Sequence, residues 1–446
     1  MIARHSQRAR FPTLAALALG FATARGAEAL EIPVVEYRLP NGLQLVMHED
    51  HSVPAVASYL FIRSGSGNER SGETGIAHLF EHMMFNGSAR FGAGTFDDLI
   101  EGAGGSTNGF TTRDFTVYLN HFPPEALDLV LELEADRMAH LIITPASLEQ
   151  ERGIVKEERR LRVDNDPMAT MDEHLFLQAF VESPYRWSII GFMADLNAIT
   201  LEEARAYFRT YYAPGNATLV LAGDLEAARA HRAVLRTLGK VPARPLPPPV
   251  LNAEPPQLGP RRARVRMAAE LPAVLVGYQA PPATSPDRAA LDVLDALLSS
   301  GDSSRLHRRL VYEKEIATVV WTSYTWLKHT GLFEIYAQAR PGVAVGEVER
   351  ELLEVLAEMT RTAPDEQELR KAKNILSTDH VRGMKTVGGK AQRIGYYREL
   401  FGDYRAMFQV ESQWEAVSAA DVVRVAQTYL TSRRRTTITL VPEPRP

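Results

Sequence analysis

The chain contains no cysteine among its 446 residues, and this absence excludes several kinds of site. Without thiols the protein has no disulfide bonds, no thiolate metal ligands, no cysteine nucleophile and no lipid-modified cysteine that could attach it to a membrane. A metal ion in this protein must therefore be held by nitrogen and oxygen ligands.

A strong imbalance of charge is also missing. The 50 basic and 55 acidic side chains give a formal net charge of −5, whereas a dedicated nucleic-acid binder shows a basic stripe. With 45% hydrophobic and 24% charged residues, the chain can bury a full core and does not resemble a disordered tail. Its length predicts about two to four domains, and we expect no nucleic-acid partner.

Long apolar runs are absent except near the start of the chain. Three arginines within the first ten residues precede the apolar run Phe11–Ala24, and small residues follow it. This is the pattern of a secretory signal, and the run is shorter than the roughly 20 residues that a membrane-spanning helix needs. Cleavage after Ala24 or after Ala29 fits equally well. We expect a signal peptide at residues 1–29, an exported protein that is periplasmic in a Gram-negative source, and no stable membrane anchor.

A proline-rich segment divides the remaining chain into two halves of similar length. Residues 242–260 read PARPLPPPVLNAEPPQLGP, and so many prolines predict an extended linker. The flanking halves, residues 30–241 and 261–446, each place strand-like runs first, helical segments next and a strand last. This order predicts two α/β or α+β sandwich domains. Duplication is one explanation of the order, although no strong internal identity accompanies it.

The sequence GIAHLFEHMMFNGS contains the motif His-x-x-Glu-His at His78, Glu81 and His82. On a helix, residues three and four positions apart share one face. Two imidazoles on adjacent turns can bind one zinc ion, and the carboxylate beside them can activate a water molecule. This order of residues occurs in zinc peptidases. The alternative is a pair of surface histidines on an amphipathic helix, for which the apolar neighbours are an unusual setting.

A catalytic zinc ion usually has three protein ligands, and the glutamates of residues 147–163 are candidates for the third. Helical spacing places Glu151 and Glu158 on one stripe with apolar residues, whereas Glu149 and Glu157 fall outside it. The apolar members of the stripe are Leu148, Ile154, Val155 and Leu161. A carboxylate on such a stripe is costly to bury unless it is paired or binds a metal. One of the two would be a direct ligand and the other would support the site, or both would form an interhelical salt bridge.

These motifs, in this order, resemble the pitrilysin (insulinase) family of zinc metallopeptidases, of the inverted zinc-motif type, which includes short bacterial members and mitochondrial processing peptidase. Further matching stretches are LPNGL at 39–43, GETGIA at 72–77, YAPGNA at 212–217 and LLSSG at 297–301. The resemblance covers essentially the whole mature chain. It implies an α+β fold class with two similar α/β sandwich domains, each a mostly antiparallel sheet packed against helices, which together form half of a clamshell.

The resemblance also implies roles for the candidate residues. His78, His82 and Glu158 would hold one Zn²⁺ per chain, Glu81 would be the general base, and Glu151 would support the catalytic site from behind the ligands. The protein would then be an exported zinc metalloendopeptidase. The alternative is a non-catalytic structural or peptide-binding subunit of the same fold.

The segment Asn108, Gly109 and Phe110 precedes a strand-like run and has two interpretations. Taken alone, Asn108-Gly109 is typical of an ordinary hairpin turn. In the family that it resembles, the matching stretch is an edge strand that pairs with the backbone of a peptide substrate, a mode that gives affinity with little sequence preference.

The second half departs from the family pattern. Where competent members have an arginine and a tyrosine seven residues apart, this chain has Val311 and Thr318. Arg308, Arg309 and Tyr312 lie nearby but would need a shifted register. We therefore expect a heterodimer with a zinc-less sister subunit that supplies the pair, or otherwise a homodimer.

Overall fold

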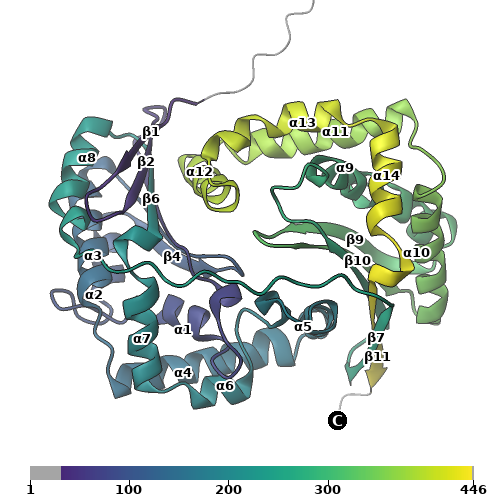
Figure 1. Ribbon diagram of the computed structural model, residues 1–446, viewed down its shortest axis with the longest axis horizontal. Helices are drawn as coiled ribbons and strands as arrows, with labels where there is room; N and C mark the ends of the chain where they lie inside the picture. Colours follow the sequence, from purple (N-terminus) through teal and green to yellow (C-terminus); the bar gives the residue numbers. More distant parts are fainter. Residues whose placement is uncertain (1–31, 444–446) are drawn as a thin grey trace, which may run out of the picture. The chain divides into compact units, whose positions relative to one another are not determined.

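The computed structural model describes residues 32–443, which contain two β-sheets packed with helices (Figure 1). The predicted signal peptide at residues 1–29 lies outside the described residues. Between residues 32 and 443, every helix is too short or too polar to cross a lipid bilayer.

The first sheet has six strands in the order β1-β2-β6-β3-β5-β4. Their bounds are β1 (Val35–Arg38), β2 (Gln44–Glu49), β3 (Val56–Ile62), β4 (Ser106–Thr111), β5 (Thr116–Phe122) and β6 (Ala217–Gly223). The pair β2–β6 is parallel, and all other neighbours are antiparallel. Strand β4 therefore forms one edge of the sheet.

The second sheet has five strands in the order β7-β11-β8-β10-β9. Their bounds are β7 (Arg261–Ala268), β8 (Ala273–Ala280), β9 (Ala317–Trp326), β10 (Gly331–Ala339) and β11 (Arg435–Glu443). Only β7–β11 is parallel. If β1 is left aside, each half has five strands in the same spatial order. Numbered along the chain within each half, these strands lie side by side in the order first, last, second, fourth and third. This repeat confirms the predicted class of two similar, mostly antiparallel sandwiches.

Helices follow the strands in both halves. The first half contains α1 (Ile76–Met83), α2 (Thr95–Gly102), α3 (Leu127–His140), α4 (Pro145–Arg159), α5 (Pro167–Ala179), α6 (Met193–Ala198), α7 (Leu201–Tyr211) and α8 (Ala227–Arg236). The second half contains α9 (Arg288–Ser299), α10 (Val345–Met359), α11 (Glu366–Arg382), α12 (Val387–Phe401), α13 (Val410–Ala416) and α14 (Ala419–Tyr429). Two wide helical turns, η3 (Arg160–Asp164) and η7 (His307–Glu313), also occur.

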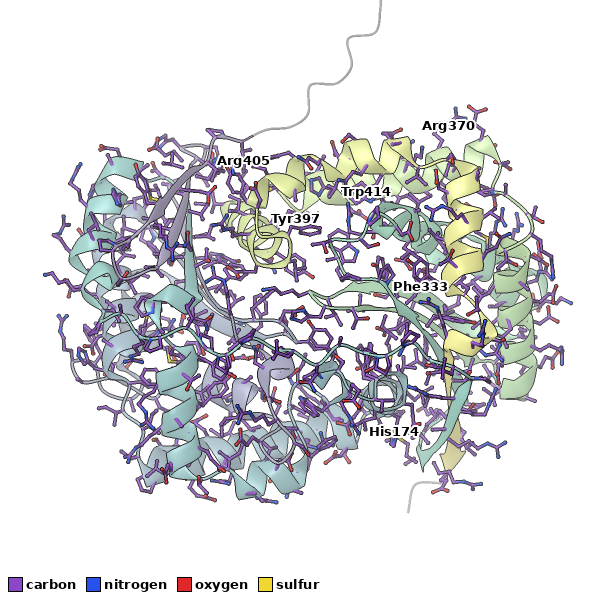
Figure 2. All side chains as sticks on the ribbon, in the orientation of Figure 1. His174, Phe333, Arg370, Tyr397, Arg405 and Trp414 are labelled. Atoms are coloured by element: carbon purple, nitrogen blue, oxygen red, sulfur yellow. The ribbon has the colours of Figure 1, made fainter. Side chains whose placement is uncertain are left out.

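The first sheet is buried on both faces, as its central strand β3 shows. Leu60 and Ile62 pack into one core with helix α1, whereas Tyr59 and Phe61 pack into a second core that is dominated by the other half of the chain. Strand β3 is therefore buried along its whole length and apolar except for Ser58, without the polar alternation of a half-exposed strand. Phe333 and Tyr397, both labelled in Figure 2, belong to this second core.

Each sheet is covered on one face by a helix from the other half. Helix α12 packs against β3 and β6, and helix α5 packs against β7, β8 and β11 (Figure 1). Small residues allow the close approach. A Cβ atom at Gly395 of α12 would lie 2.0 Å from the ring of Phe61, and one at Gly277 of β8 would lie 2.8 Å from Leu175 of α5. The two halves are therefore packed together, because each contributes a helix that covers the other half's sheet.

The predicted linker, residues 242–260, contains no helix or strand but is tied to both halves. The carboxylate of Glu254 accepts hydrogen bonds from the backbone N–H groups of residues 181–183 in the first half. The Gln257 side chain donates to the carbonyl oxygen of Arg435 in the second half, at 2.9 Å. The domain boundaries on either side of this segment stay predictions.

Candidate metal centre

Helix α1 starts at a position that only glycine can occupy. Gly75, its N-cap, has φ +90°, and a Cβ atom there would lie 2.5 Å from the carbonyl oxygen of Ile190. The buried carboxylate of Glu69 accepts hydrogen bonds from the N–H groups of Gly75 and Ala77, at 3.0 and 2.8 Å. These are backbone donors that the helix itself leaves without partners. The start of the motif helix is therefore fixed by the preceding loop.

The apolar residues around the motif form the buried side of α1, and its histidines face helix α4. The buried apolar residues of the helix are Ile76, Ala77, Leu79, Phe80 and Met83. The side chains of His78 and His82 are only 12% and 22% exposed. The alternative of two solvent-exposed histidines does not fit this environment.

Helix α4 brings the third candidate ligand to α1. The Oε2 atom of Glu158 lies 3.3 Å from Nε2 of His82 and 3.6 Å from Nε2 of His78. One potential ligand atom from each of these residues lies within 4.8 Å of the other two. Within residues 32–443, this is the one group of three or more histidine or acidic side chains with such geometry.

Two imidazole nitrogens and one carboxylate oxygen form the donor set of a catalytic zinc site. Oε2 of Glu158 and Nδ1 of His78 are buried and lack hydrogen-bond partners, which is unusual for polar atoms in a protein interior. Burial, together with the neighbouring His82, lowers the pKa of His78 to about 4. His78 is therefore neutral near pH 7, the state that binds a metal ion, whereas His82 would release a proton when a metal ion binds. The residues present fit a zinc ion.

Glu151 and Glu158, the two candidates for the third ligand, occupy different positions. Oε2 of Glu151 lies 3.4 Å from Nδ1 of His82, on the side of the ring away from Glu158. Burial opposes a charge on His82, but the carboxylates of Glu151 and Glu158 on either side of its ring outweigh this effect and raise the pKa of His82 to about 9. The other oxygen of Glu158 lies 3.1 Å from Nε of Arg162. Glu158 therefore faces the cluster and Glu151 supports the ring of His82, although both roles stay predictions.

The stripe predicted along α4 is narrower than expected. Leu148 and Val155 are buried, but Ile154 is 46% exposed and Leu161 is 72% exposed. The reason for Leu161 is that α4 ends at Arg159 and continues as the wide turn η3, which changes the residue spacing. Side chains outside the predicted stripe, Glu149 and Glu157, are exposed as expected.

Strand β4 approaches the motif helix. Residues 108–110 lie within β4 and pair with β5, so the interpretation of Asn108-Gly109 as a hairpin turn is wrong; the turn occupies residues 112–115. A Cβ atom at Gly109 would lie 3.0 Å from Cγ of Glu81. Asn108, Gly109 and Phe110 thus lie on the edge strand beside the candidate base, and their role in binding substrate stays a prediction.

Glu81 has a hydrogen-bond partner that the sequence interpretation missed. The hydroxyl of Thr111 donates to Oε2 of Glu81 at 2.6 Å. Burial raises the pKa of Glu81, while this hydrogen bond opposes the shift. The position of Thr111, two residues beyond Gly109, could have indicated that both face the same way on a strand.

Within residues 261–443, the repeat has no equivalent of the histidine cluster. Counted from their N-caps, α9 carries Leu294 where α1 carries His82, and α11 carries Ala372 where α4 carries Glu151. Both substitutes are buried apolar residues. The described residues of the chain therefore contain one candidate metal site.

The structure also locates the positions that depart from the family pattern. Val311 lies in the wide turn η7 and packs against the core. Thr318 lies on β9 and donates to the side-chain oxygen of Gln338 at 3.0 Å. Nearby Arg309 is bound by Glu358 at 2.7 Å. These residues are engaged within the second half itself.

Two family models match the chain. Insulinase (peptidase family M16) matches residues 44–191, and the peptidase M16 inactive domain matches residues 198–376. The first includes the motif helix, α4 and β4, whereas the second begins before α7 and extends through most of α11.

Similar proteins cover nearly the whole chain. The zinc protease PqqE of Helicobacter pylori is 31% identical over 412 residues, which are 91% of this chain and 92% of that protein. The crystal structure of a protease from Helicobacter pylori aligns with TM-score 0.89 at 29% identity, covering 92% of this chain and all of that one. The periplasmic protease PqqL of Escherichia coli shares the fold at TM-score 0.77 and 18% identity, and the match covers 93% of this chain but 48% of PqqL.

Proposed function

Because this chain belongs to the insulinase family of peptidases, family M16, we propose that it is a zinc metalloendopeptidase that hydrolyses peptides or short unfolded segments. The observation that carries the proposal is the convergence of His78, His82 and Glu158, whose ligand atoms lie within 4.8 Å of one another. Glu81, on the same helix as the two histidines, would be the general base.

In this proposal His78, His82 and Glu158 hold one zinc ion, and Glu151 steadies the ring of His82. Bound zinc would polarise the scissile carbonyl and acidify the attacking water. The Glu81 carboxylate accepts a proton from that water, holds it, and delivers it to the amine nitrogen as the C–N bond breaks. Its raised pKa, caused by burial, brings it closer to neutral pH than an exposed glutamate.

The edge of β4 would hold the substrate. Its outer side has no neighbouring strand within residues 32–443, so its backbone groups can pair with an extended peptide. Asn108, Gly109 and Phe110 would form this contact. Backbone pairing gives affinity with little preference for sequence, which suits a peptidase acting on varied peptides.

A heterodimer with a zinc-less sister subunit is the assembly that we propose, with a homodimer as the other arrangement. Two observations support a partner. Val311 and Thr318 replace the expected arginine and tyrosine and are engaged locally, and the chain matches 48% of PqqL. Co-purification from the native host and gel filtration test this assembly. Strong peptidase activity of the lone chain as a monomer or homodimer contradicts the need for a sister subunit.

We also propose that the protein is exported, and periplasmic in a Gram-negative source, through a signal peptide at residues 1–29. The arginines and the short apolar run of that segment support export. N-terminal sequencing of protein from the native host tests this directly. A mature chain that still starts at Met1 contradicts it.

The decisive experiment measures metal content and peptide cleavage on protein purified with its native partners. We expect about one zinc per chain and turnover of a fluorogenic peptide. Glu81→Gln should abolish turnover and leave zinc bound, while Glu149→Gln, an exposed glutamate on α4, should behave as wild type. A zinc-loaded complex that cleaves no member of a diverse peptide library would instead support the non-catalytic alternative.

A further inference from the structure

Thr111 is the last residue of strand β4, and its side chain reaches the motif helix. Its hydroxyl donates to Oε2 of Glu81 at 2.6 Å, a short hydrogen bond of the kind that a hydroxyl makes to a carboxylate. Within residues 32–443, the second oxygen of Glu81 has no hydrogen-bond donor. The carboxylate is therefore held by one oxygen and free at the other.

Gly109 and Thr111 lie on the same face of β4 because alternate residues of a strand point the same way. A Cβ atom at Gly109 would lie 3.0 Å from Cγ of Glu81 and 3.5 Å from the ring of Phe85. Gly109 thus gives the stem of Glu81 the space that it occupies, and Thr111 binds its carboxylate. One strand face determines where the carboxylate lies.

Within the hairpin the Thr111 hydroxyl has one longer contact, with the Thr116 hydroxyl at 3.4 Å. Thr116, directly opposite on β5, donates its own hydroxyl proton to the carbonyl oxygen of Ser64 at 2.8 Å. The turn itself is closed by Thr112, which bonds the carbonyl oxygen of Phe115 at 2.9 Å. The Thr111 proton is therefore available to Glu81.

We propose that Thr111 is a positioning residue for Glu81: its hydroxyl fixes one carboxylate oxygen to the end of β4 and thereby leaves the other oxygen for proton transfer. The inference rests on the proposed function. Strand β4 would then position both the peptide, which pairs with its outer edge, and the base, which Thr111 holds. The strand would therefore set the distance between the scissile bond and the base. Small errors in such an alignment reduce turnover strongly.

The test compares Thr111→Val, which keeps the shape but removes the donor, with Thr111→Ser, which keeps the donor. In the zinc-loaded complex we expect kcat of Thr111→Val to fall about 10- to 100-fold, with KM within about threefold of wild type and zinc content unchanged. Thr111→Ser should recover most of kcat. Thr439→Val, whose hydroxyl on β11 is buried without a hydrogen-bond partner, is the matched control and should keep wild-type kinetics.

A second measurement does not depend on activity. Crystal structures of zinc-loaded wild type and Thr111→Val should show the Glu81 carboxylate ordered on Thr111 in the first and rotated or split between conformers in the second. An unchanged Glu81 conformer or an unchanged kcat in Thr111→Val overturns the inference, as does a Thr111→Ser variant as slow as the valine variant. A wild-type complex without peptidase activity contradicts the proposed function instead, and the two crystal structures still decide the role of Thr111.

Discussion

Arg63, directly after strand β3, forms a bidentate ion pair with Glu399 on helix α12. Its Nε atom lies 2.7 Å from Oε2 and its Nη2 atom 3.2 Å from Oε1. Thr218 of β6 also donates to this carboxylate, at 2.6 Å. The Glu399 side chain is only 3% exposed, so a buried charge from one half depends on partners from the other half.

Glu399→Gln should destabilise the protein by about 2 kcal/mol, because it weakens the charge-assisted hydrogen bonds to Arg63, whose side chain is 28% exposed and therefore only partly desolvated. Glu415→Gln, an exposed glutamate on α13, should change the unfolding free energy by less than about 0.5 kcal/mol. Denaturant unfolding followed by fluorescence measures both. Equal midpoints for Glu399→Gln and wild type would mean that the pair contributes nothing to the joining of the halves.

Glu158→Gln and Glu151→Gln should weaken zinc binding to different degrees. Loss of a direct ligand should leave less than half of the chains zinc-bound after dialysis, whereas loss of a residue that orients a ligand typically reduces affinity about 10- to 100-fold. Competition with a zinc chelator measures the affinities, and Glu157→Gln, exposed on the same helix, is the control. If Glu151→Gln loses more zinc than Glu158→Gln, the two roles are exchanged.

The parts of the site that follow one helical period were predictable from the sequence. Spacing alone places His78 and His82 on one face of a helix, and the structure has them there. The resemblance assigned Glu158 the place nearer the cluster. Thr111 could not be identified in this way, because its contact with Glu81 depends on how an edge strand lies against a helix 30 residues away in the chain.

The packing of the halves was not predictable either. The order of elements indicated two similar sandwiches, and the repeated strand order confirms it. Local periodicity does not predict that α5 and α12 each cover the sheet of the other half, since an amphipathic helix does not specify which sheet it covers. The exposure of Leu161 was missed for a related reason: the stripe assumed an unbroken α-helix, and the wide turn η3 interrupts it.

Glu334 on β10 is a buried acid between the halves. It accepts a hydrogen bond from Thr325 of β9 at 2.9 Å, and the charged groups around it are Asp172 of α5, Arg113 before β5 and Asp295 of α9. Burial and the nearby Asp172 raise the pKa of Glu334 to about 8. The folded protein therefore binds this proton more tightly than the unfolded chain does.

The free energy of unfolding should consequently decrease as the pH rises, because the folded protein holds the proton of Glu334 more tightly than the unfolded chain does. The unfolded chain loses this proton near pH 4.5, and the folded protein holds it until about pH 8. Between these values the unfolded state binds fewer protons, so each pH unit costs up to about 1.4 kcal/mol of stability. Glu334→Gln cannot titrate and keeps an oxygen for Thr325, so its unfolding free energy relative to wild type should increase between pH 5 and pH 8.5. Denaturant unfolding at these two pH values measures the change, with Glu415→Gln as the control, and a pH-independent difference would show that Glu334 is ionised in the folded protein across this range.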